Sequence, residues 1–264
     1  MKKIIKKIIA ILGIVLFVLI SGLTALIFFP QALFAHSYTY ENFTIFHDLD
    51  FDQSAFNKGL NQANNLVKES ELFDPSYQFE VFIAHKNRFN TVDDKVLGDW
   101  SVARAINNNI IIKKKIDVAA GTVENGVNYF SLAYVIAHEM VHCLQANKYG
   151  KLKFNPFKHP PLWKLEGYPE YIARADLLKR ETYHLSLGIK GFLDRTKGEF
   201  EVRDIIQLST NESTPYLYYK GRLMTEYLMD IKGMTYDEIL KDNRSEAEVF
   251  GAMMTWFKTY SGDN

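Results

Sequence analysis

The sequence contains a single cysteine and no evident internal repeat, and neither positive nor negative charge is in excess. Its single cysteine, Cys143, excludes an intramolecular disulfide, and we expect it to behave as a small buried hydrophobic residue. Basic and acidic residues are equal in number, 31 of each, and no basic patch is evident, so no nucleic-acid partner is expected. The residues that follow position 29 are enough for one sizeable core, or for two subdomains around a cleft, and no low-complexity linker is evident among them.

Charge is also missing from residues 8–29, which are mainly apolar. This run is longer than the roughly 20 residues that a helix needs to cross a bilayer. The lysines within residues 1–7 favour a cytoplasmic N-terminus. We therefore expect a single-pass anchor in the cell membrane, a stalk over residues 30–40 and an extracytoplasmic domain over residues 41–264. A cleaved signal peptide is the alternative, although its apolar core is usually only about 7–15 residues long.

The most informative motif is His138-Glu139-Met140-Val141-His142, an H-E-x-x-H within a mostly apolar segment. Two histidines four residues apart lie on one face of a helix and can bind one zinc ion, while the intervening glutamate can take a proton from a zinc-activated water. Burial of these polar groups costs free energy unless they have strong partners, and a metal ion is the simplest such partner. The alternative is a chance motif on a solvated helix.

A catalytic zinc ion usually has three protein ligands. A third histidine at the spacing of the metzincin motif is excluded, because Gln145 and Lys148 occupy the positions that would need glycine and histidine. His159 lies in a Lys-His-Pro-Pro turn signal and is a weak candidate. Glu166 is the better candidate, because it lies in a second apolar segment with helical spacing that follows a Pro-Pro pair.

Two neighbours of Glu166 leave alternatives open. Glu170 follows one helical turn later and could accept a hydrogen bond from a ligand histidine, but a solvated glutamate is an equal possibility. Pro169 is unfavourable inside a helix, because proline removes a backbone hydrogen bond. It could instead lie near the first turn.

The H-E-x-x-H motif followed by Trp163-x-x-Glu166-Gly167 resembles the gluzincin metallopeptidases, and distantly the catalytic domain of M1-type aminopeptidases. The resemblance implies that His138, His142 and Glu166 bind Zn²⁺ and that Glu139 is the general base. The segment Tyr218-Tyr219-Lys220-Gly221 is similar to the family's Y-x-K-G segment, whose tyrosine stabilises the oxyanion. This implies that role for Tyr218, with Tyr219 as the alternative; either tyrosine could instead belong to an aromatic core.

The resemblance extends over roughly residues 75–240 and has two departures. No G-A-M-E-N-like segment, which reads a free amino terminus in the family, precedes the H-E-x-x-H motif. The large N-terminal β domain of M1 enzymes also has no counterpart here. We therefore expect a minimal gluzincin of the peptidase MA-like group, an endopeptidase rather than an aminopeptidase.

The expected function is hydrolysis of a peptide or protein substrate by a membrane-anchored zinc peptidase. Two alternatives remain: a zinc-binding but catalytically idle interaction module, and a metal-free extracytoplasmic module. Glu139 and Tyr218 argue against the idle module, because neither is needed merely to hold a metal ion.

The apolar spacing predicts strands in the first half of the chain and helices in the second, which favours an α+β fold: a small mixed sheet followed by a mainly helical zincin-like domain. The family resemblance further implies that the strand at 105–114 lies at the sheet edge beside the H-E-x-x-H helix, and Lys113-Lys114-Lys115 is expected to be its solvated end. The other predicted elements are strands at 43–46 and 77–84, and helices at 54–70, 130–148, 162–180, 184–195, 215–231, 235–241 and 245–260.

Overall fold

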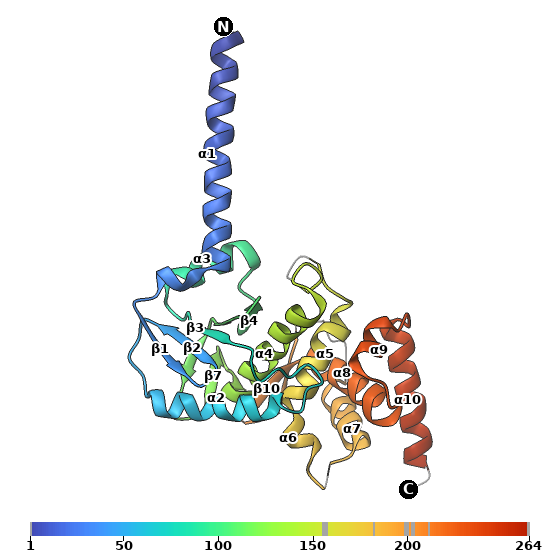
Figure 1. Cartoon of the computed structure of the whole chain (residues 1–264). Helices are drawn as coiled ribbons and strands as arrows, with labels where there is room; N and C mark the ends of the chain where they lie inside the picture. The colour runs from blue at the N-terminus through green and yellow to red at the C-terminus, as the bar shows by residue number, and fades with distance from the viewer. Residues whose placement is uncertain are drawn as a thin grey trace.

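The computed structural model describes residues 2–154, 158–181, 183–197, 201, 204–210 and 212–262. Its fold is α+β, as the sequence predicts: an apolar N-terminal helix comes first, mixed sheets follow, and helices dominate the second half. Figure 1 shows the main sheet on one side of the domain and the later helices on the other. Helix α1 (Lys2–Phe28) projects from the end of the sheet side.

Helix α1 carries the long apolar run of the sequence. An 18-residue stretch of its segment Ile4–Phe28 has a mean hydropathy of 2.8, and most of that stretch is not buried against the domain. The helix is therefore long and apolar enough to cross a membrane.

Residues 30–40 do not form the stalk that we expected. Pro30–Leu33 is a short 3₁₀ helix, η1, and His36–Tyr40 is strand β1, which pairs antiparallel with β2 (Phe43–His47). The turn between the two strands contains Glu41 with φ at 51°. The alternation Ser-Tyr-Thr-Tyr within β1 is a strand pattern, and both tyrosines pack on the hydrophobic core. Burial of these aromatic rings holds this segment on the sheet.

The main sheet adds three strands to this pair: β3 (Phe79–Ile83), β4 (Ala103–Ile106) and β5 (Asn109–Ile112). Its order is β1-β2-β3-β5-β4, so β1 and β4 are the edge strands. The central strands β2, β3 and β5 are parallel, and each edge strand is antiparallel to its neighbour. Strand β4 therefore leaves one backbone edge unpaired within the sheet.

Different helices cover the two faces of this sheet. Helices α2 (Gln53–Val67) and α4 (Leu132–Tyr149) pack on one face, in the cluster that contains Val81. Its neighbour Phe82 points to the other face, where it contacts helix α3 (Arg88–Leu97), η1 and the last turn of α1. Both side chains are fully buried, as successive residues of a strand covered on two faces should be.

Two expectations for residues 105–114 are wrong. The segment contains a hairpin rather than one strand, with a turn at Asn107, where φ is 59°. Lys113 is not at a solvated strand end: its side chain is fully buried, and its ammonium lies 2.8 Å from the carboxylate of Asp93 and 2.6 Å from that of Asp94. These partners come from α3, so the local sequence around the lysine carries no sign of them.

Helix α3 was not predicted, whereas the predicted helices are all present, with two main differences. The helix expected over 162–180 is broken at Arg174, and the helix expected over 215–231 ends in a π-helical turn. Two small sheets, which the periodicity did not predict, flank the helices. The elements are β6 (Lys115–Asp117), β7 (Thr122–Asn125), β8 (Asn128–Ser131), α5 (Leu162–Ala173), α6 (Ala175–Leu178), α7 (Leu185–Arg195), β9 (Ile205–Ser209), β10 (Glu212–Pro215), α8 (Tyr216–Glu226), η2 (Tyr227–Ile231), α9 (Tyr236–Lys241) and α10 (Glu246–Gly262).

Helices α5 and α8 cross at a pair of glycines. A Cβ atom at Gly167 would lie 2.6 Å from the carbonyl oxygen of Gly221, and one at Gly221 would lie 3.1 Å from the Cα of Gly167. Both glycines belong to the segments that carry the family resemblance, one after Glu166 and the other three residues after Tyr218. The missing side chains therefore let the two helices approach closely and bring those two segments together.

Candidate metal centre

Two helices supply the three predicted metal ligands. Helix α4 begins at its N-cap Ser131 and carries His138 and His142 one turn apart, while α5 carries Glu166. His138 and Glu166 are buried, and His142 is partly buried. One nitrogen of each imidazole and one carboxylate oxygen point to a common centre.

The spacing of these atoms fits a tetrahedral zinc site. His138 Nε2 lies 3.1 Å from Glu166 Oε2 and 3.1 Å from His142 Nε2, and the third edge, from His142 Nε2 to Glu166 Oε2, is 3.2 Å. Ligand atoms placed about 2.0–2.1 Å from a tetrahedral zinc ion would be about 3.3 Å apart. The three side chains therefore fit Zn²⁺ as ligands, with room for a fourth on the open side.

The other nitrogen of each imidazole faces an acceptor. His142 Nδ1 lies 2.8 Å from Gln145 Oε1, and His138 Nδ1 lies 3.3 Å from Glu170 Oε2. Nδ1 of each ring therefore carries the hydrogen when a metal is bound, which leaves the Nε2 lone pairs directed at the centre. Glu170 is buried and lies at ion-pair distance from His138, but the His138 Nδ1 atom makes no hydrogen bond within the described residues, so the expected hydrogen bond to Glu170 stays a prediction.

The sequence did not identify Gln145 as part of the site. In the sequence analysis this residue only helped to exclude the metzincin motif, which needs a glycine at position 145. Its amide nitrogen donates to the Leu165 carbonyl at 3.2 Å and to the Tyr236 hydroxyl at 2.7 Å, so its oxygen must face His142. The Leu165 carbonyl is available because Pro169, four residues later, has no N–H to offer it. The proline inside α5 thus supplies the acceptor that fixes Gln145.

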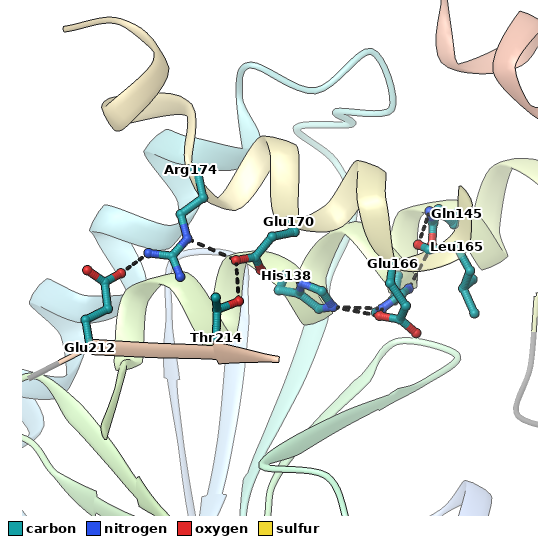
Figure 2. A network of polar contacts seen from close by, with 9 residues as sticks. His138, Gln145, Leu165, Glu166, Glu170, Arg174, Glu212 and Thr214 are labelled. Atoms are coloured by element: carbon teal, nitrogen blue, oxygen red, sulfur yellow. Dashed lines mark hydrogen bonds and ion pairs between the residues drawn. The ribbon is translucent and has the colours of Figure 1, made fainter. Parts of the chain in front are cut away.

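Glu170 is held by a second polar network, which Figure 2 shows on the opposite side of His138 from Gln145. Its Oε1 accepts hydrogen bonds from Arg174 Nε at 3.0 Å and from Thr214 Oγ1 at 3.2 Å. Arg174 also pairs with Glu212 on β10. Burial raises the pKa of Glu170, but the charge of Arg174 and the contact with His138 outweigh it and bring that pKa down to about 2. Glu170 therefore remains a carboxylate.

The remaining predicted catalytic residues lie beside the three ligands. The Tyr218 ring stacks on the His138 ring with centroids 4.8 Å apart, and Tyr218 lines the same cavities as Glu139 and Glu166. Tyr219 instead points into the interface with α7, where its hydroxyl donates to the Gly188 carbonyl at 3.1 Å. Of the two tyrosines, Tyr218 is therefore at the site. Burial, and then the nearby carboxylate of Glu166, raises the pKa of Glu139, although the two histidines oppose this.

The two weaker candidates take no part in the ligand group. His159 lines the cleft near His142, but its Nδ1 faces the Pro160 carbonyl at 2.7 Å, and it does not belong to the three-residue group. Cys143 is completely buried in the core. Burial raises the pKa of its thiol well above the usual value, which agrees with the expectation of a buried hydrophobic residue.

A cleft passes on both sides of the metal centre. On one side a cavity of about 310 Å³ has mainly apolar walls, to which Phe130, Val135 and Leu217 contribute. On the other side a cavity of about 320 Å³ is lined by more polar residues, among them Arg104. Glu139 lines both cavities, as do Glu166 and Tyr218. A ligand longer than one residue could therefore extend past the centre in either direction.

Replacing Gln145 by leucine should weaken zinc binding by about 10–100-fold, the usual effect of removing a partner that orients a ligand histidine. The leucine cannot accept the Nδ1 hydrogen of His142, so the ring loses its fixed orientation. Titration of the metal-free chain with zinc against a competing chelator measures the change. Gln78→Leu, at an exposed position, is the matched control. Equal zinc affinities of the two variants would refute the role of Gln145.

Zinc binding at pH 7 should release about one proton per chain. Without a metal, burial lowers the pKa of His138, but hydrogen bonds and charges of Glu166 and Glu170 outweigh this and raise it to about 10. This raised pKa stabilises the metal-free fold below about pH 6.5, and that stabilisation is lost as pH rises through about 10. Calorimetric zinc titrations in buffers of different ionisation enthalpy count the protons. No release at pH 7 would contradict the protonated state of His138.

Comparison with known proteins assigns no family to the chain. No family model matches it, and no curated protein matches it either. Function must therefore be argued from the site itself.

Proposed function

We propose that this chain is a membrane-anchored zinc peptidase of the gluzincin type, in which His138, His142 and Glu166 hold the metal ion. The proposal depends chiefly on one observation: two imidazole nitrogens and one carboxylate oxygen, from two different helices, lie 3.1–3.2 Å apart. Two histidine nitrogens and one carboxylate oxygen, with a fourth position left open, are one of the usual ligand sets of a catalytic zinc ion. Helix α1 would anchor the chain, with residues 1–7 in the cytoplasm and the domain outside.

The residues around this centre can perform hydrolysis of a peptide bond. A bound zinc ion would acidify a water molecule and offset negative charge on the substrate carbonyl. Glu139 accepts a proton from the attacking water and passes it to the amide nitrogen as the C–N bond breaks and a C–O bond forms. The raised pKa of Glu139 suits both steps, because the carboxylate holds the proton between them. Tyr218 can donate its hydroxyl hydrogen to the developing oxyanion.

Replacing Tyr218 by phenylalanine should lower kcat by about 10²–10³-fold, the usual effect of removing one oxyanion donor. The ring that stacks on His138 is retained in this variant, so zinc content should not change. Tyr219→Phe is the matched control, because that hydroxyl only joins α8 to the Gly188 carbonyl. Cleavage of casein by both variants is compared with that by the unaltered chain. An equal decrease in kcat for the two variants would show that the Tyr218 hydroxyl does not stabilise the oxyanion.

Metal content and proteolysis together test the proposal against its two alternatives. The full chain, purified in detergent and supplied with zinc, should contain about one zinc ion per molecule and should cleave casein. Absence of bound zinc would favour the metal-free module. Bound zinc without any cleavage, over a range of peptide libraries, would favour the catalytically idle module.

A further inference from the structure

Helix α1 is attached to the end of the domain from which it emerges. The last turn of α1 is part of the fold: Ile27 is 8% exposed and, with Phe28, belongs to the cluster that contains Phe82 and Phe89. The Phe28 carbonyl accepts a hydrogen bond from Asn109 Nδ2 of β5 at 3.1 Å. No flexible linker therefore separates α1 from the sheet.

This attachment fixes how far the domain can lie from a bilayer. The uncharged part of α1, residues 8–28, rises about 31 Å at 1.5 Å per residue, which matches the roughly 30 Å hydrocarbon core of a membrane. If α1 spans the bilayer, as in the proposed function, its docked last turn lies at the lipid headgroups. The surface of the domain beside that turn must then lie close to the membrane.

Two segments form that surface. Figure 1 shows α3 and the chain that follows α4 at the end of the domain where α1 leaves it. Exposed apolar side chains occur in both: Val96 and Trp100 are 40% and 50% exposed, and Leu152 is 84% exposed. Phe29, directly after α1, is 68% exposed. Aromatic and aliphatic residues at such a position would reach the interfacial layer of a bilayer.

Basic side chains surround these apolar ones. The exposed basic residues of the two segments are Lys86, Arg88, Lys95, Lys151 and Lys153. Within residues 86–100 and 150–154, Asp99 is the one exposed acidic residue, because Asp93 and Asp94 pair with the buried Lys113. The surface is therefore positive as well as apolar, and this combination favours anionic lipid headgroups.

We propose that this surface, defined by residues 86–100 and 150–154, binds the anionic lipid headgroups of the membrane that α1 crosses. The more polar of the two cavities at the metal centre is lined by Val96, Trp100 and Phe154 from these same segments. The cleft would therefore open beside the bilayer. This arrangement, which rests on the proposed function, would give the peptidase access to polypeptide segments that lie at the membrane surface.

Spin labels on the full chain in lipid nanodiscs test the proposal. Single cysteines are placed at Leu152, at Leu187 on α7, which Figure 1 shows at the far end of the domain, and at Ile14 within α1. The native Cys143 is completely buried and remains unlabelled. With phosphatidylserine in the bilayer, the ratio of oxygen to nickel-complex accessibility should be several-fold higher at Leu152 than at Leu187.

The outcomes separate this proposal from the proposed function. In a Lys151→Glu, Lys153→Glu background, or in bilayers of phosphatidylcholine alone, the ratio at Leu152 should fall toward that at Leu187. A lipid-exposed label at Ile14 with equal ratios at Leu152 and Leu187 would overturn the headgroup contact and leave the anchor intact. An aqueous label at Ile14 would overturn the anchor, and the headgroup contact with it.

Discussion

Replacing Glu139 by glutamine should reduce peptide hydrolysis by about 10²–10⁴-fold, the contribution of a positioned general base. Glutamine has nearly the same shape but cannot accept a proton from water. Because the proposed ligands are His138, His142 and Glu166, the variant should bind zinc as the unaltered chain does. Initial rates of casein cleavage and the zinc content of the same samples measure the two effects.

The control for this substitution is Glu69→Gln. Glu69 is an exposed glutamate whose carboxylate pairs with Lys179 at 2.7 Å, so its loss should leave the cleavage rate unchanged. Cleavage by Glu139→Gln at the control's rate would show that another group takes the proton. Loss of zinc from Glu139→Gln would instead show that this carboxylate helps to hold the metal.

Replacing Gly167 by alanine should destabilise the fold by about 3 kcal/mol, at the upper end of the usual cost of overpacking. The added methyl group would lie 2.6 Å from a backbone oxygen of Gly221 and 2.7 Å from Thr225 Oγ1. Helices α5 and α8 must then move apart. Their separation would shift Tyr218 relative to Glu166, so the remaining folded protein should also lose activity. Urea unfolding of the full chain in detergent measures the stability.

Gly251→Ala on α10 is the matched control, because nothing lies within 4 Å of the Cβ atom that it adds. Alanine has a higher helix propensity than glycine by about 1 kcal/mol, so this variant should be as stable as the unaltered chain or slightly more stable. Equal unfolding midpoints for the two alanine variants would mean that the crossing of α5 and α8 tolerates a side chain.

The histidine pair and the long helices could be predicted because their signals are local. His138 and His142 are four residues apart, and apolar spacing marks both α4 and α5. Helices α7, α9 and α10 were found for the same reason. Glu166 could be chosen as the third candidate from its apolar segment, and the family resemblance supported that choice. How the two helices pack could not be predicted, because the spacing between them does not specify it.

Features that depend on distant partners could not be predicted. Lys113 looks like a surface lysine until Asp93 and Asp94 surround it. The β4–β5 hairpin turns at Asn107, and an Asn-Asn pair is a weaker turn signal than Asn-Gly. The role of Gln145 depends on a carbonyl in another helix. In each case the decisive interaction joins residues that the sequence does not place side by side.

The proline within α5 has a consequence for how this sequence can change. Any other residue at position 169 would restore an amide N–H that competes with Gln145 for the Leu165 carbonyl. If this N–H bonded to the Leu165 carbonyl, the Gln145 side chain would lose that acceptor and could rotate. The His142 ring would then lose its fixed orientation as well. Positions 145 and 169 are thus energetically coupled although they lie on different helices. A substitution that improves α5 as an isolated helix should therefore weaken the orientation of His142 as a proposed zinc ligand.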